Sequence, residues 1–341
     1  MSKVAVLGAG AVGLRVVKHL LTPRIGGVAN LVDRVILCDT SGERLIAIRS
    51  ILDQWADCIE SQERAFPKDA DVDAIVVATP RGTQAPLVRT AISSGVPIVL
   101  SGDGLAETVS VLKLADEAAL VGVPVVLGAG FSPGLSCVLA AHASSWFDRV
   151  EEIHVTKVGA GGPACALVHH RALSRLSYDW RNNGWVRRPG GSGRELCWFP
   201  EPVGPMDCFR AALPDPVLLH HAFPNVQRIT ARMGATRRDR LTAPFPMLSP
   251  PPVEGGIGAI RVEIRGQRGI SQDVKILGAA EKPAVAAALV AATAVDWVLA
   301  GRLQVSGMGS LAEMVEPVGF LTDLSDRGLV VEIFEGEHAI F

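Results

Sequence analysis

The chain has 341 residues, a length that indicates two domains at the usual size of roughly 100–200 residues each. Its 33 lysines and arginines nearly balance 35 acidic residues, and the formal net charge of −2 argues against binding to nucleic acid or to an anionic membrane. Hydrophobic residues make up 48% of the chain and charged residues 20%, which excludes a wholly disordered protein.

Six cysteines are spread along the chain, and none forms a C-x-x-C pair, so no cysteine-based zinc or iron–sulfur site is expected. No carboxylate spacing supports a metal site at His154, His169 and His170, so no other metal site is predicted. An apolar strand at Val4–Leu7 begins almost at once, without the features of a signal peptide. No apolar stretch reaches the roughly 20 residues that a membrane span requires. These features predict a cytoplasmic protein with free thiols and no membrane partner.

The first half of the chain alternates short apolar strands with helices. Strands are predicted at residues 4–7, 35–38, 74–78, 97–100 and 125–127. Helices are predicted from the first glycine-rich turn to residue 21, and at 42–55, 85–93 and 106–121. Such alternation predicts an α/β fold with a Rossmann-type, doubly wound parallel sheet covered on both faces.

The second half lacks the regular alternation of strands and helices. Alternating patterns predict strands at 150–158, 226–234 and 259–277, and Pro283 suits the first turn of a helix that runs to about residue 299. Five prolines within residues 244–252 predict a stiff loop, and two short helices are expected at 311–315 and 319–326. We therefore expect an α+β substrate domain with a mostly antiparallel sheet. The predicted domains are residues 1–132 and 133–341, with the alternative that 300–341 packs back on the first domain.

The sequence G-A-G-A-V-G at Gly8–Gly13 directly follows the first strand and opens a helix. In that context G-x-G-x-x-G predicts a dinucleotide-binding turn. Gly8 permits the tight turn, Gly10 lets the backbone approach a pyrophosphate, and Gly13 lets the helix pack closely on the strand. The alternative is a glycine-rich turn in an α/β domain that binds no nucleotide.

Asp39 closes the second strand, where an acidic residue is expected to bind the adenosine ribose. Its distance from Gly8 exceeds the usual spacing of roughly 20 residues, and an insertion at 22–34 accounts for the excess. A carboxylate there would repel a 2′-phosphate, so NAD(H) is favoured over NADP(H). Arg44 keeps NADP(H) open as an alternative, because its guanidinium can reach a phosphate.

The turn Gly128–Leu135, with the sequence G-A-G-F-S-P-G-L, follows the last strand of the predicted nucleotide domain. It resembles the G-F/L-x-P-G-L turn of the saccharopine dehydrogenase-like family, which includes saccharopine reductases, carboxynorspermidine dehydrogenases and lysine dehydrogenase-type enzymes. Gly159–Pro163 resembles the Gly-Gly-x-Pro turn that opens the family's substrate domain, and the run from Gly301 to Gly328 is similar to the family's ending. The resemblance covers most of the chain and implies NAD(P)-dependent hydride transfer at a C–N bond.

The resemblance also places strand-end cofactor contacts in two further loops, one after the strand at 74–78 and one after the strand at 97–100. The predicted cofactor-binding residues are Gly8, Gly10, Ala11, Val12, Gly13, Asp39, Thr40, Ala78, Thr79, Pro80, Ser101 and Gly102.

Three positions differ from the family members that make or break saccharopine. Ser132 stands where those enzymes have Asp, Gly159-Ala160 where they have Cys, and Gly102 where they have Tyr. The resemblance therefore implies the fold and the cofactor rather than saccharopine as substrate. Ser132 is kept as a candidate substrate-binding residue.

The segment from Lys157 to Arg171 opens the second domain and is dense in proton-transfer and anion-binding side chains. His169 and His170 are candidate proton relays, because imidazole titrates near neutral pH. Lys157 is a further catalytic candidate, and Arg171 is a candidate clamp for a substrate carboxylate. The alternative is that one histidine packs in the core and the other is solvated.

Asp103 follows the fifth strand, at the edge of the sheet where ligands of open α/β sheets bind. It is a candidate proton acceptor or ribose contact. The alternative is a turn-forming aspartate in Gly-Asp-Gly, which is a common role.

The sequence as a whole predicts an oxidoreductase that reduces an imine, or runs the reverse reaction, on an amino acid or secondary amine. The expected partners are a nicotinamide dinucleotide, a small amino-acid-like substrate and a second copy of the chain in a homodimer. Two alternatives stay open: a dehydrogenase that acts on a C–O bond of a sugar or hydroxy acid, and a dinucleotide-binding protein without catalysis.

Overall fold

A computed structural model describes residues 2–23, 30–68, 71–80, 82–247 and 255–334. Part of the predicted insertion at 22–34 and part of the proline-rich loop at 244–252 lie outside these residues. The chain divides into two compact units. The first comprises Met1–Leu135 and Ala284–Leu329, and the second comprises Ser136–Pro283 and the segment that starts at Val330.

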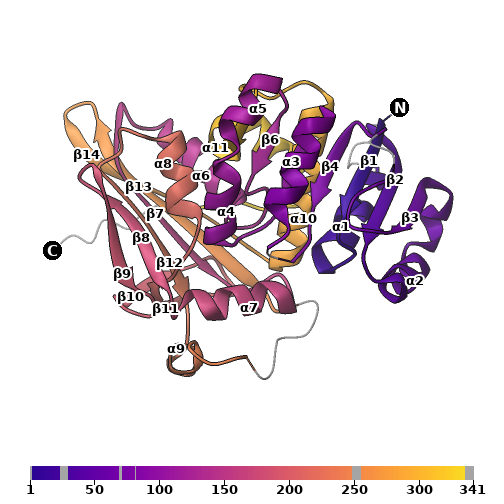
Figure 1. Cartoon of the computed structure of the whole chain (residues 1–341). Coiled ribbons are helices and arrows are strands. Elements are labelled where there is room, and N and C mark those ends of the chain that lie inside the picture. The colour runs from indigo at the N-terminus through magenta and orange to yellow at the C-terminus, as the bar shows by residue number, and fades with distance from the viewer. Residues whose placement is uncertain (1, 24–29, 69–70, 81, 248–254, 335–341) are drawn as a thin grey trace. The chain divides into compact units, whose positions relative to one another are not determined.

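The first unit is built on a seven-stranded sheet in the order β15-β6-β5-β4-β1-β2-β3, and every pair in it is parallel (Figure 1). Strands β4, β5 and β6 are short and fully buried, as expected of strands that are covered on both faces. The predicted α/β class with a Rossmann-type sheet is thus confirmed. The strands are β1 Ser2–Leu7, β2 Val32–Asp39, β3 Ile59–Glu63, β4 Ala74–Val77, β5 Ile98–Leu100, β6 Val125–Leu127 and β15 Met308–Ser310.

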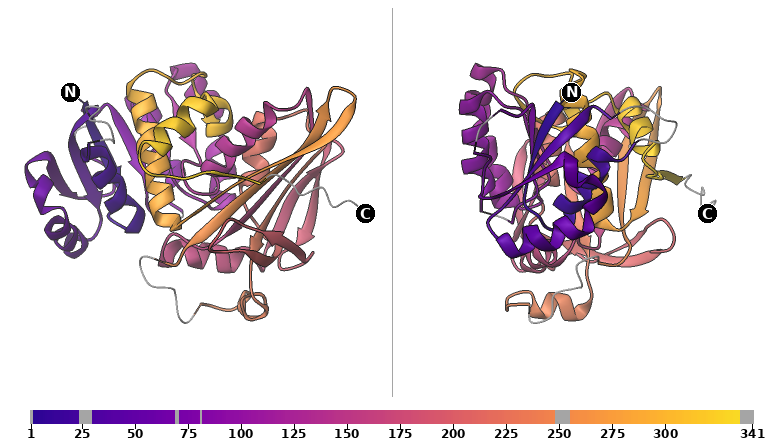
Figure 2. Two further views of the ribbon diagram at one scale, coloured as in Figure 1. Left: turned by 180° about the vertical axis from the view of Figure 1, so that it is seen from behind. Right: turned by 90° about the vertical axis from the view of Figure 1, so that its right-hand side faces the viewer.

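Helices flank both faces of this sheet (Figure 2). The chain moves from β1 towards β3 through one set of helices and from β4 towards β6 through another. Because such crossovers are right-handed, opposite directions of travel put the two sets on opposite faces. The helices are α1 Ala11–Leu21, α2 Gly42–Ile51, η1 Asp53–Cys58, α3 Gln84–Ser94, α4 Leu105–Leu112, α5 Ala115–Val121, α10 Pro283–Leu299, α11 Leu311–Met314 and α12 Pro317–Ser325.

Two predicted helices are interrupted. The helix predicted at 42–55 ends at Ile51, because Leu52 leaves helical geometry and buries its side chain while Ile51 stays 63% exposed. The helix predicted at 106–121 breaks between α4 and α5, where the backbone of Leu114 is non-helical. Strand β3 was not predicted, because its sequence I-E-S-Q-E is polar and lies at the sheet edge beside β2.

The C-terminal part of the first unit rejoins its sheet. Strand β15 pairs with β6 in parallel. Arg327, which follows α12, forms an ion pair with Asp296 of α10 and donates a hydrogen bond to the carbonyl of His19 in α1. Both charged side chains are almost completely buried, so they tie α1, α10 and the chain beyond α12 together.

The second unit contains a mixed nine-stranded sheet. Strand β7 pairs with β12 in parallel, and all other pairs are antiparallel, which confirms the predicted mostly antiparallel sheet. The stretch predicted as strand at 259–277 is a long hairpin of β13 and β14, drawn in orange (Figure 2). The strands are β7 Arg149–Val158, β8 Leu176–Arg181, β9 Gly184–Pro189, β10 Glu195–Trp198, β11 Pro205–Arg210, β12 Arg228–Gly234, β13 Gly258–Arg268, β14 Ser271–Glu281 and β16 Glu332–Phe334.

The two faces of this mixed sheet differ in chemistry. Side chains at alternate positions, such as Ile153, Val155 and Val262, are completely or almost completely buried and form the core. The intervening positions carry charged and polar side chains, among them His154 and Glu263. The helices of this unit are α6 Leu135–Ser144, α7 Pro163–Ala172, α8 Asp215–Ala222 and α9 Arg237–Thr242. Among the described residues of both units, no helix has the length and apolarity that crossing a bilayer requires.

Candidate cofactor and substrate sites

The glycine turn between β1 and α1 has the tight geometry that its sequence predicts. Gly8 adopts φ +101°, and a Cβ there would lie 2.5 Å from the carbonyl oxygen of Ala78. A Cβ on Gly13 would lie 1.8 Å from the carbonyl oxygen of Gly8, so α1 touches the end of β1 at this point. Gly10 is different: it is exposed, it precedes the first residue of α1, and nothing lies within 4 Å of the position of its Cβ.

The start of α1 has the electrostatics of an anion site. Its first turn holds no acidic residue, and Ala11 and Val12 begin the helix just after Gly10. Unpaired backbone N–H groups and the positive end of the helix dipole attract negative charge at such a helix start. Gly10 therefore combines open space at its Cβ position with the backbone N–H groups and the positive dipole end of α1.

Asp39 lies at the end of β2 and is 6% exposed. Its Oδ2 accepts a hydrogen bond from the backbone N–H of Ala9 at 2.8 Å, and its Oδ1 accepts one from Ser41 at 2.9 Å. The half-exposed guanidinium of Arg44 lies 3.1 Å from Oδ2. Asp39 thus braces the glycine turn, and Arg44 occupies the open side of its carboxylate. Thr40, the next residue in the chain, is exposed.

The loops after β4 and β5 lie next to each other, because these two strands are paired. After β4 come Ala78, Thr79 and Pro80, and the hydroxyl of Thr79 lies 2.6 Å from that of Thr83. The hydroxyl of Ser101 donates to the carbonyl of Val77 at 2.9 Å, which links the two strand ends.

Two residues that the sequence did not single out shape this edge. The carboxylate of Glu107 accepts hydrogen bonds from the backbone N–H groups of Gly82 and Gln84, each at 2.8 Å. The amide of Gln84 fills the space above Gly102, since a Cβ on Gly102 would lie 1.6 Å from its Nε2. Glu107 lies on α4, more than twenty residues along the chain from Gly82 and Gln84, so no local sequence pattern predicts these hydrogen bonds.

Two further candidates of the first unit lie in loops. Asp103 is partly exposed and lies between Gly102 and the start of α4. Ser132 is 4% exposed and lies in the turn before α6, where Gly134 adopts φ +139° and a Cβ on it would lie 2.0 Å from the carbonyl oxygen of Gly130.

In the second unit, the predicted histidines and arginine are consecutive residues of α7. Side chains at adjacent helical positions do not face one another. His169 and His170 are both buried, so the alternative with one solvated histidine is wrong. His169 contacts the thiol of Cys165, and the Nε2 of His170 lies 3.0 Å from the carbonyl oxygen of Thr242, whereas Arg171 is exposed. The structure therefore places these three candidates on different sides of one helix.

Lys157 lies on β7 and is 3% exposed. It shares the strand face of Ile153 and Val155, so its stem runs through the apolar side of the mixed sheet. This placement separates Lys157 from the charged face of the same sheet.

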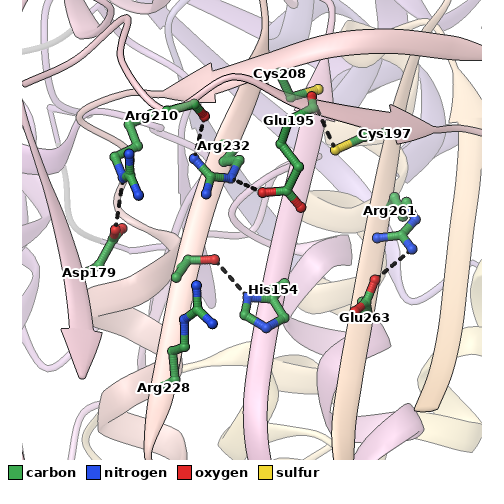
Figure 3. A network of polar contacts seen from close by, with 12 residues as sticks. His154, Asp179, Glu195, Cys197, Cys208, Arg210, Arg228, Arg232, Arg261 and Glu263 are labelled. Atoms are coloured by element: carbon green, nitrogen blue, oxygen red, sulfur yellow. Dashed lines mark hydrogen bonds and ion pairs between the residues drawn. The ribbon is translucent and has the colours of Figure 1, made fainter. Parts of the chain in front are cut away.

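The charged face of the mixed sheet was not anticipated as a feature (Figure 3). The His154 ring lies between Thr230 and Glu152, with both nitrogen–oxygen distances at 2.8 Å. Burial lowers the pKa of His154, against the raising effect of Glu152. The signal was present in the sequence, because Arg261 and Glu263 alternate with apolar residues along β13.

Ion pairs line this face, both within β13 and between β12 and β10. Glu263 lies 2.6 Å from both Arg261 and Arg265; burial would raise its pKa, but the two guanidinium groups hold it below the usual range. Arg232, 9% exposed, pairs with Glu195 at 2.6 Å. A polar hollow of about 330 Å³ lies at one end of the face, lined by Glu151, Glu152, Gln227, Arg265, Gln272 and Asp273 among others.

No protein-family model and no curated protein matches the chain. Among solved structures, apo saccharopine dehydrogenase (L-Glu forming) from Saccharomyces cerevisiae is similar, with a TM-score of 0.68 and 13% identity over 98% of this chain and 100% of that one. Amine dehydrogenase from Mycobacterium smegmatis matches with a TM-score of 0.54 and 12% identity over 92% of this chain and 96% of that one. The chain therefore has a saccharopine dehydrogenase-like fold.

Proposed function

We propose that the chain is an NAD(P)-dependent oxidoreductase that acts at the C–N bond of an amino-acid-like substrate. The glycine turn between β1 and α1 carries the proposal. It lies where the strand order of the parallel sheet reverses, between β1 and β4, and open α/β sheets bind dinucleotides at that point. The C–N specificity rests on the sequence resemblance and on the fold shared with an enzyme named amine dehydrogenase.

The residues of the first unit fit a dinucleotide. The open space at Gly10 and the N-terminal end of α1 suit a pyrophosphate, and the carboxylate of Asp39 suits two ribose hydroxyls once Arg44 turns away. When bound, the nicotinamide supplies or accepts the hydride. Because Asp39 disfavours a 2′-phosphate, NAD(H) is the proposed cofactor, with NADP(H) as the alternative through Arg44.

We assign substrate binding to the second unit, through α7 and the end of β7. His169 would give a proton to the substrate nitrogen or take one from it. Arg171 is exposed and would hold a substrate carboxylate with two parallel hydrogen bonds. Lys157, Asp103 and Ser132 remain candidates for the substrate site.

Calorimetric titration with NADH tests the cofactor assignment. Gly10→Val puts a branched side chain where phosphate oxygens would approach, so it should abolish NADH binding and leave the circular dichroism spectrum unchanged. Retained NADH affinity in this variant would contradict the pyrophosphate assignment.

Turnover assays test the reaction. NADH consumption with keto acid plus amine, but not with sugars or hydroxy acids, supports C–N chemistry. His169→Ala should lower turnover at least about tenfold with unchanged NADH affinity. Arg171→Ala should mainly raise the Michaelis constant of the substrate. Tight NADH binding without turnover of any substrate would instead indicate a dinucleotide-binding protein.

A further inference from the structure

Helix α7 places a thiol next to an imidazole. Cys165 and His169 are four residues apart, and this spacing puts both side chains on the same side of the helix. The Sγ atom of Cys165 lies 3.5 Å from Nε2 and 3.8 Å from Nδ1 of His169. These distances lie within the range for a hydrogen bond to sulfur, so a proton can pass between the two groups.

The position of Cys165 in the helix favours the negative charge of a thiolate. Pro163 is the first residue of α7, so Cys165 lies in its first turn, where the positive end of the helix dipole stabilises an anion. That turn holds no acidic residue. Gly162, at φ +112°, sets the entry of the chain into the helix.

We propose that Cys165 is a reactive thiol, deprotonated by His169, and the preferred site on this protein for covalent modification by soft carbon electrophiles. The proton moves from Sγ to a ring nitrogen of His169. The thiolate then attacks carbon. With iodoacetamide, a C–S bond forms, the C–I bond breaks and iodide leaves. With an α,β-unsaturated carbonyl compound, sulfur adds to the β-carbon and a proton is delivered to the α-carbon, so no oxidant is needed.

The other cysteines provide internal comparisons. Cys38, Cys137, Cys197 and Cys208 are each no more than 4% exposed. Burial raises the pKa of the Cys38 thiol to about 12, which suppresses its thiolate further.

Cys58 is the closest match to Cys165. Both are partly buried, but among the described residues no histidine is hydrogen-bonded to Cys58. Accessibility alone would therefore make the two thiols similar, and the imidazole distinguishes them.

The test is limited alkylation of the native full-length protein with iodoacetamide, followed by digestion and mass mapping of each cysteine. At pH 7 we expect Cys165 to react at least about tenfold faster than Cys58. His169→Gln, which removes the base, should lower the Cys165 rate about tenfold, towards that of Cys58. His221→Gln, at an exposed histidine of α8, is the matched control and should leave the Cys165 rate unchanged.

Equal rates for Cys165 and Cys58, or a Cys165 rate unaffected by His169→Gln, would overturn the proposal. If His169→Gln does not fold, the pH profile of the wild-type protein decides. An imidazole-assisted thiol reaches its labelling plateau below pH 8, whereas an ordinary thiol keeps gaining rate towards pH 9. A Cys165 profile that follows that of Cys58 would contradict the proposal.

One consequence rests on the proposed function. An adduct on Cys165 would block His169, so labelling should abolish turnover while NADH affinity is preserved. The two hypotheses fail separately. Fast labelling of a protein without turnover would refute the enzyme assignment alone, and full turnover by a protein with slow labelling would refute the reactive thiol alone.

Discussion

The two sheets of this protein use their side chains differently. In the parallel sheet of the first unit, both faces of the central strands are apolar, and Val4, Ile75 and Val99 are completely buried. In the mixed sheet of the second unit, Ile153 and Val262 line an apolar face, while His154, Glu263 and Arg232 line a charged one.

This difference determines where each unit can carry chemistry. A strand buried on both faces has no side chain free for a ligand, so the candidate ligand contacts of the first unit come from strand ends and from the loops and helices that follow them, as at Gly10, Asp39 and Asp103. The second unit can present charged side chains from the strands themselves. Substitutions that change backbone shape should therefore be most damaging in the first unit, and substitutions that change charge in the second.

The largest effect is expected at Gly13. Gly13→Ala places a Cβ 1.8 Å from the carbonyl oxygen of Gly8, so α1 must move away from β1. We expect the free energy of unfolding to fall by at least about 3 kcal/mol in urea denaturation. Gly10→Ala is the matched control, because nothing lies within 4 Å of its Cβ, and its stability should match that of the wild type. Equal losses in both variants would show that helix packing does not require Gly13.

The next effect is expected on the charged face. Glu263→Gln removes the anion between Arg261 and Arg265 and should cost about 2 kcal/mol of unfolding free energy, because the Arg261 guanidinium is left largely buried. Glu117→Gln, which breaks an exposed pair with Arg89, should cost less than about 0.5 kcal/mol. A cost for Glu263→Gln as small as that for Glu117→Gln would show that the charged face contributes little to stability.

Glu263 also predicts a pH dependence. Its pKa is lower in the folded protein than in the unfolded chain, so its stabilising effect is present above the ordinary value of 4.5 and is lost as the pH falls through the folded pKa. Glu263→Gln should therefore flatten the stability curve below pH 4.5.

His19 gives the first unit a separate pH dependence. Burial, with help from Arg327, lowers the pKa of His19 to about 4 from its usual 6.5. The unfolded chain therefore takes up a proton first as the pH falls below 6.5, and the folded state loses stability down to about pH 4. The measurement is the free energy of unfolding from denaturation curves at pH 7 and at pH 4.5. Between these two pH values we expect the wild type to lose between about 1 and 2 kcal/mol more than His19→Gln does. Parallel curves for variant and wild type would contradict the assignment.

The smallest effect is a change of preference at Asp39. Asp39→Ser removes the carboxylate that would repel a 2′-phosphate, and the ratio of NADH to NADPH affinity should fall about tenfold, which corresponds to about 1.4 kcal/mol. Asp39→Asn is the control that separates the charge of the carboxylate from its hydrogen bond. It removes the charge but keeps an oxygen that can accept from the Ala9 N–H. If the wild type already binds NADPH more tightly than NADH, Arg44 becomes the residue to test.

The local elements of the first half follow from the sequence alone. The strand at Val4–Leu7, the glycine turn and the helix to Leu21 were predictable because each depends on apolar periodicity and on glycine at fixed positions. The start of α10 at Pro283 was predictable for the same kind of reason, since proline suits the first helical turn. Asn182 and Asn183, both at positive φ, were an available signal for the β8–β9 hairpin that the prediction missed.

Tertiary structure decided what depends on distant partners. Strand β3 is polar and β15 is only three residues long, so each is a strand because a neighbour supplies its hydrogen bonds. The contact between Cys165 and His169 requires α7, which the Gly- and Pro-rich sequence around it did not predict. The charged face became visible only when three strands set His154, Thr230 and Glu263 side by side, because pairing register between distant segments is not encoded in the periodicity of any one of them.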